Sequence, residues 1–218
     1  MIDQSASIYK VNLIEKLLAT VLAKVSNFIP EGGIWLNTQR PEWNDANNAL
    51  VGNGVSMVTL YYLNRFLNFF DSIISNSKTE EIQLSEELVT FFSAVLETLT
   101  QHKAILSGAI SNTDRKSVLD GLGTAGSDYR NSIYHSDFTG RKSTLSKSDI
   151  LEFIETTQSY LQHTIVANKR ADNMYHAYNL MTVENENEVS ISYLPEMLEG
   201  QVAVLSSGYL SPKEALSL

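Results

Sequence analysis

The sequence predicts an all-α fold built from antiparallel helical hairpins. Only 4 of its 218 residues are Pro and 11 are Gly, while 43% are hydrophobic, so turn residues are scarce and long regular elements are favoured. Apolar side chains also recur every three or four positions over several long segments, which is the spacing of one helix face. We therefore expect a single helical domain over residues 1–218.

The first two helices are predicted from this spacing. The first covers residues 8–28, with Ser7 as its cap and Pro30, followed by two glycines, as its end. The second covers residues 55–75, where additional Tyr and Phe side chains widen the apolar face. We expect this second helix to pack on two sides.

The middle of the chain predicts three more helices. The third begins at Ser85, places two Glu residues in its first turn, where the helix dipole favours carboxylates, and ends at Gly108. The fourth begins near Thr113, and the glycines of its GLGTAG sequence predict a bend. A polar turn over residues 135–149 then leads to a fifth helix, capped by Ser148.

The C-terminal part is less regular. Alternating residues predict a short strand over 189–194, and a sixth helix follows over 196–205. Ser211, Pro212 and Glu214 then form a helix-start signature a few residues before the last residue. This pattern suggests a segment of a longer protein.

Composition excludes several function classes. A net charge of −9 repels a phosphate backbone, so we expect no nucleic-acid partner. Because the chain has no Cys, disulfides and thiolate chemistry are excluded. The four His residues show no metal-ligand spacing, so no metal site is expected. We find neither a secretory signal nor an 18-residue apolar window, and so expect a cytoplasmic protein without a membrane partner.

The long loop over residues 30–54 is the strongest candidate for function. Its RPEWNDANNALVG sequence has neither a helical nor a strand period, and long loops of this kind are often functional. Sugars stack their apolar faces on Trp and pair their hydroxyl groups with Asn, Asp and Arg. The candidate residues are Arg40, Glu42, Trp43, Asn44, Asp45 and Asn47. The alternative is that Asn44 or Asp45 caps a helical turn and Trp43 fills the core.

The run EWNDANNALVGNG resembles the Trp-Asn-Asp segment of inverting glycoside phosphorylases of the cellobiose and chitobiose type. The resemblance covers about a dozen residues. It implies part of an (α/α)6 toroid, with Asp45 as general acid and Trp43 and Asn44 lining the site. It also implies an oligosaccharide or glycoside as substrate and no bound cofactor, with inorganic phosphate as co-substrate of a phosphorylase.

A hydrolase of the same stereochemistry needs a second carboxylate about 6.5 to 9.5 Å from the first, which activates water. Asp128, Glu196 and Glu199 are the candidates for this role. Tyr175 and His176 are further candidates for sugar binding, although a Tyr and His cluster is also typical of a partly buried structural patch.

A second hypothesis comes from a different function class. The chain is too short for the twelve helices of a complete toroid, which need on the order of 300 residues. The alternative is therefore a helical carbohydrate-binding or scaffold module without catalysis. Helix faces left uncovered in such a segment favour self-association, so we expect a homo-oligomer.

Overall fold

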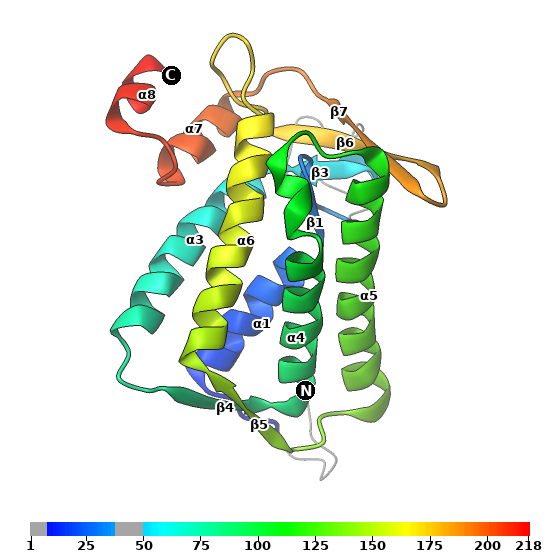
Figure 1. Ribbon diagram of the computed structural model, residues 1–218, viewed down its shortest axis with the longest axis vertical. Coiled ribbons are helices and arrows are strands. Elements are labelled where there is room, and N and C mark those ends of the chain that lie inside the picture. Colours follow the sequence, from blue (N-terminus) through cyan, green and yellow to red (C-terminus); the bar gives the residue numbers. More distant parts are fainter. Residues whose placement is uncertain (1–7, 38–49) are drawn as a thin grey trace.

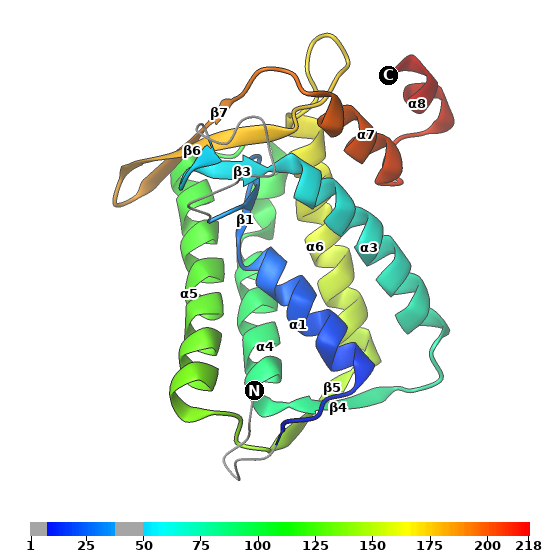
Figure 2. The ribbon, with the colours of Figure 1, turned by 180° about the vertical axis from the view of Figure 1, so that it is seen from behind.

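The computed structural model describes residues 8–37 and 50–218. Long helices form a bundle with a five-stranded antiparallel sheet across one end and a two-stranded ribbon across the other (Figures 1 and 2). The all-α prediction is therefore wrong, and so is the expectation of a partial (α/α)6 toroid, because a sheet closes one end of the bundle.

The helices largely follow the predicted apolar periods. They are α1 (Leu13–Val25), α3 (Met57–Asn76), α4 (Glu86–Gln101), the 3-10 helix η1 (Lys103–Ser107), α5 (Asn112–Ser136), α6 (Lys147–Ala167), α7 (Leu198–Ser206) and α8 (Pro212–Ser217). Helix α1 begins later than predicted, because the side chain of Asn12 accepts a hydrogen bond from the backbone N–H of Glu15. Ser146, not Ser148, caps α6 and forms a capping box with Asp149.

The sheet has the strand order β1-β2-β3-β6-β7. Its strands are β1 (Phe28–Ile29), β2 (Gly33–Trp35), β3 (Gly54–Ser56), β6 (Tyr178–Asn185) and β7 (Glu188–Tyr193). The strand predicted over 189–194 is confirmed as β7, whereas β1, β2 and β3 lie in segments predicted as helix end and loop.

Pro30, Glu31 and Gly32 form a tight turn between β1 and β2, and Gly33 is the first residue of β2. Gly33 has a φ of 123°, and a Cβ atom there would lie 2.8 Å from the backbone oxygen of Ser56 in β3. Glycine permits both this backbone conformation and this close approach. The residues predicted to end a helix therefore start a sheet.

Strands β4 (Glu81–Ser85) and β5 (Lys142–Ser146) pair as the antiparallel ribbon. Each strand leads directly into a helix, β4 into α4 and β5 into α6. The ribbon therefore holds the N-terminal ends of α4 and α6 at one end of the bundle (Figure 1).

Helix α5 runs without interruption through the glycines that predicted a bend. A Cβ atom on Gly121 would lie 2.6 Å from Cγ2 of Thr98 in α4, and one on Gly126 would lie 2.9 Å from Oγ of Ser26. These two glycines thus permit close packing of α5 against its neighbours.

The core lies among α1, α3, α4, α5 and α6, and includes fully buried Leu18, Leu67, Phe92 and Phe153. Within residues 8–37 and 50–218, no helix has the length and apolar character needed to cross a membrane.

Candidate functional site

The loop residues that carry the sequence hypothesis lie outside the described residues. They are Arg40, Glu42, Trp43, Asn44, Asp45 and Asn47. The described flanks of this loop are tied to the sheet. Trp35 donates a hydrogen bond from Nε1 to the backbone oxygen of Gly52 over 2.8 Å, and Leu36 and Leu50 pack in one apolar cluster with Tyr178.

Tyr175 and His176 lie at the sheet end of the bundle. Tyr175 is only 3% exposed and packs edge-on against Tyr61, with ring centroids 6.4 Å apart. His176 stacks on Tyr193 with ring centroids 4.2 Å apart. Burial lowers the pKa of His176, and the positive charge of Arg170 lowers it further. The structure thus places Tyr175 in the core and His176 at its border.

The remote carboxylates considered as catalytic partners lie in separate places. Glu196 forms an ion pair with Arg170, which also pairs with Asp172. Glu199 lies in the first turn of α7. Asp128 lines a cavity between α4 and α5.

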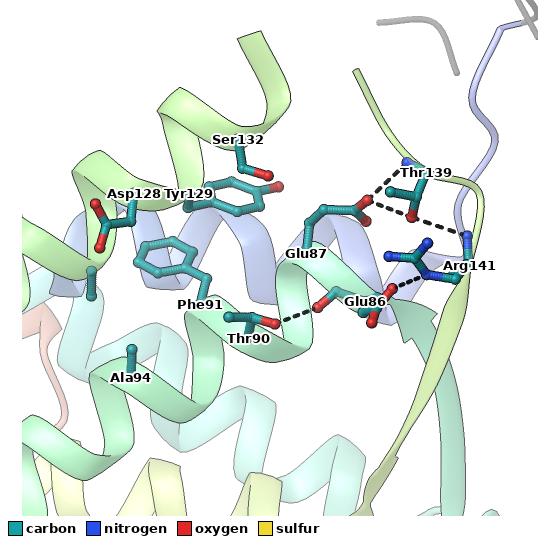
Figure 3. A pocket seen from close by; sticks show the side chains of 11 residues that line it. Glu86, Glu87, Thr90, Phe91, Ala94, Asp128, Tyr129, Ser132, Thr139 and Arg141 are labelled. Carbon is teal, nitrogen blue, oxygen red and sulfur yellow. Dashed lines mark hydrogen bonds and ion pairs between the residues drawn. The ribbon is translucent and has the colours of Figure 1, made fainter. Parts of the chain in front are cut away.

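This cavity has a volume of about 420 Å³. Figure 3 shows the side chains that line it, which come from α4, α5 and the segment that leads into β5. Glu86 and Glu87 lie in the first turn of α4, and Asp128 and Tyr129 lie on α5. Arg141 is the residue directly before β5.

Two carboxylates of the cavity have partners on the segment before β5. Glu86 forms an ion pair with Arg141. Oε1 of Glu87 accepts two hydrogen bonds from Thr139, from the backbone nitrogen at 2.8 Å and from Oγ1 at 2.7 Å. These contacts fix the α4 end of the cavity.

The Glu87 carboxylate is ionised at neutral pH. Burial would raise its pKa, but the hydrogen bonds from Thr139, the contact with its own backbone N–H and the charge of Arg141 together outweigh burial, so the pKa is lowered. Its second oxygen, Oε2, is buried and has no hydrogen-bond partner among the described residues. A buried, charged acceptor without a donor is costly, so this oxygen favours a ligand that can donate a hydrogen bond.

Two aromatic rings line the cavity beside these carboxylates. Phe91 and Tyr129 are stacked, with ring centroids 4.8 Å apart and planes 13° apart. In Figure 3 the Tyr129 hydroxyl points towards the side of Glu87. Burial, together with the charges of Glu15 and Glu87, raises the pKa of Tyr129 to about 12. The hydroxyl group therefore keeps its proton at neutral pH and can donate it in a hydrogen bond.

The sequence does not reveal this cavity. The sequence indicates Glu86 and Glu87 only as favourable residues for a helix start, and Asp128 only as a candidate second carboxylate for Asp45. The cavity forms because α5 folds back along α4 and brings residues 86–94 beside 125–132. Glu86 and Glu87 are far in sequence from Asp128 and Tyr129, so these four residues do not form a recognisable sequence motif.

No protein-family model and no curated protein matches this sequence.

Proposed function

We propose that this chain is a binding domain for a small organic cation, which it holds in the cavity between α4 and α5. The observation that carries the proposal is the buried Oε2 atom of Glu87, an ionised acceptor without a partner among the described residues. An ammonium group would donate a hydrogen bond to it and would also neutralise its charge.

The charges around the cavity support a cation. The cavity is lined by three carboxylates, of Glu86, Glu87 and Asp128, and by one guanidinium, of Arg141, which gives a formal net charge of −2. Arg141 pairs with Glu86 and its charge also acts on Glu87, but the three carboxylates outnumber this one cation and attract a positive ligand. Like-signed side chains around a cavity focus the field and raise the local concentration of the opposite ion.

The aromatic wall supports an organic cation rather than a hydrated metal ion. Tyr129 presents partly exposed apolar surface next to the carboxylates, and the buried Phe91 is stacked behind it. An alkyl group fits such a surface, and an ammonium group is also attracted to an aromatic ring face. No group of three His, Cys, Asp or Glu side chains that could hold a metal ion occurs in residues 8–37 and 50–218.

A titration with matched probes tests the proposal. We expect n-butylammonium to bind in an NMR titration and n-butanol, which is similar in shape but uncharged, not to bind. Glu87→Gln should abolish binding. Glu97→Gln is the matched control, because Glu97 lies on the same helix and bonds to Gln101 outside this cavity. Equal binding of both probes, or unchanged binding by Glu87→Gln, would contradict the proposal.

Glycoside chemistry at Asp45 is a second proposal, and one observation favours it. Both flanks of the loop are held against the sheet, through Trp35 and Gly52 and through the packing of Leu36 and Leu50. Such anchoring suits a loop that presents functional side chains. On this proposal Asp45 protonates the glycosidic oxygen while phosphate or water attacks the sugar.

Turnover assays test the second proposal. We expect Asp45→Asn to remove phosphorolysis or hydrolysis of disaccharides and to leave the thermal unfolding midpoint unchanged. Trp43→Ala should abolish saturable binding of the same disaccharides in calorimetry. Full turnover by the Asp45→Asn protein would exclude Asp45 as the general acid.

A further inference from the structure

A second cavity adjoins the proposed cation site. It has a volume of about 380 Å³ and lies between α1, α4 and α5. Its lining is largely apolar and aromatic, with contributions from Tyr9, Val11, Ala19, Leu88, Tyr129 and Phe138.

The two cavities share one lining residue. Tyr129 lines both of them. Next to it, Glu87 lines the first cavity and Leu88 the second, and in the same way Thr139 lines the first and Phe138 the second. Residues 87 and 88 thus line different cavities, and so do residues 139 and 138. The two cavities are therefore neighbours at Tyr129.

The charged groups of the second cavity are paired or positive, and its Tyr9 hydroxyl group is buried without a hydrogen-bond partner among the described residues. Glu15, which is buried, accepts a hydrogen bond from Ser85 and pairs with Lys142 over 3.2 Å. Lys16, also at this cavity, is positively charged. A second ammonium group would be repelled there, whereas a hydrocarbon group would bury the partly exposed apolar surface of Val11 and Ala19.

We infer that the ligand is a monocationic amine with an apolar chain, whose ammonium group sits at Glu87 and whose chain passes Tyr129 into the second cavity. This inference rests on the proposed function for the ammonium group and adds the chemical class of the rest of the ligand. The first cavity favours the ammonium group through its negative charge, and the second favours the hydrocarbon chain through its apolar surface. The two cavities together therefore select an amphipathic amine over a diamine.

A series of alkylammonium ions tests the inference. We expect the dissociation constant in NMR titrations to fall about fourfold for each added methylene from ethylammonium to hexylammonium, because each buried CH₂ contributes a similar transfer free energy. 1,6-Diaminohexane should bind more weakly than hexylammonium. Hexylammonium, but not ethylammonium, should shift the ring resonances of Phe138.

Two alanines of α1 provide a matched pair of variants. Ala19 lines the second cavity, and Ala23 is exposed on the same helix. Ala19→Leu should fill the cavity and flatten the chain-length series without changing ethylammonium binding. Ala23→Leu should leave the series unchanged.

The outcomes separate this inference from the proposed function. If ethylammonium binds in a Glu87-dependent way but affinity does not rise with chain length, the second cavity takes no part and the inference is wrong, while the proposed function stands. If no alkylammonium ion binds, the proposed function is wrong and the inference fails with it. The chain-length series of the unmodified protein decides this even if Ala19→Leu does not fold.

Discussion

Arg115 of α5 and Glu31 of the β1–β2 turn form a buried ion pair that joins the helical bundle to the sheet. Their charged groups lie 2.7 Å apart, and the side chains are only 5% and 14% exposed. Arg115 also donates hydrogen bonds to the backbone oxygens of Pro30, Val189 and Ile110. One guanidinium thus satisfies acceptors from three separate segments of the chain.

Removing the Arg115 guanidinium should strongly destabilise the folded protein. We expect Arg115→Ala to lower the free energy of unfolding by about 3–5 kcal/mol, because it leaves Glu31 charged and buried without its partner. Lys116→Ala is the control. Its pair with Asp120 spans one turn of the same helix near the surface and contributes about 0.5 kcal/mol or less. Urea denaturation measures both values, and similar losses in the two variants would contradict this role for Arg115.

The glycines of α5 should respond in opposite ways to Ala. At Gly123 a Cβ atom would meet nothing within 4 Å, so Gly123→Ala should stabilise the protein by about 0.5–1 kcal/mol through helix propensity. At Gly121 the new atom would press on Thr98, whose Oγ1 already bonds to the backbone oxygen of Ala94. Gly121→Ala should therefore be less stable than Gly123→Ala by more than about 1 kcal/mol. Equal thermal midpoints of the two variants would argue against close packing of α4 and α5.

Alkaline pH should destabilise the fold through its buried tyrosines. Burial raises the pKa of Tyr129 to about 12 and that of Tyr160 further, from an ordinary value of 10.0. Above pH 10 the unfolded chain therefore loses these protons first, so stability falls as the pH rises from 10 towards the folded pKa values. We expect Tyr129→Phe to reduce the slope of stability against pH between 10 and 12. Parallel curves for the two proteins would refute this assignment.

Tyr160 allows a second comparison. Its hydroxyl donates a hydrogen bond to the backbone oxygen of Leu99 over 2.7 Å. Tyr160→Phe should therefore cost about 1 kcal/mol even at neutral pH, because that buried oxygen loses its donor. Urea denaturation at pH 7 measures this loss, and an unchanged midpoint would contradict it.

Acid should weaken both the cation site and the fold through Glu87. Because the folded pKa of Glu87 lies below its ordinary value of 4.5, its stabilising contribution is complete above about pH 4.5 and is lost as pH falls through the folded value. Butylammonium affinity should stay constant from pH 7 to 5 and then fall as the carboxylate is protonated. A loss of affinity already between pH 7 and 6 would point to another group.

Self-association remains a prediction, and the structure indicates where to test it. Exposed apolar side chains occur on α3 and on α7, which pack together, among them Phe69 at 58% and Val202 at 52% exposure. We expect a dimer of two copies of this chain, through these faces, in light scattering. Phe69→Glu should then shift the mass to that of a monomer, whereas Tyr134→Glu, on the exposed surface of α5, should not. A monomeric unmodified protein would contradict the prediction.

The sequence predicted long helices well and short strands poorly. Helices α3 and α6 have sustained apolar periods and lie close to their predicted places. Strand β1 has two residues and β2 and β3 have three each, which is too short for an alternation to be recognised. Strand β1 pairs with β2 and β2 with β3, and β3 in turn pairs with β6. The pairing of β3 with β6 is distant in sequence, so local patterns do not contain it.

The proposed cation site has no local sequence pattern, for the same physical reason. Glu87 lies on α4 and Tyr129 on α5, far apart in sequence. They line one cavity only because α4 packs against α5. The sequence indicates Asp128 as a candidate second carboxylate, but as a partner of Asp45, which lies outside the described residues. Local patterns predict the elements, and their packing creates the cavity.

The β4–β5 ribbon has a consequence for how fast the chain folds. It joins residues far apart in sequence, such as Gln83 and Thr144, which are 61 positions apart and whose side chains are hydrogen-bonded. Helices α4 and α5, by contrast, are connected by a short segment and can dock early. The ribbon closes the large loop that contains this helix pair, at an entropic cost that must be met before its own hydrogen bonds form. Ribbon closure is therefore expected to be a late, slow event in folding, after the two helices have paired.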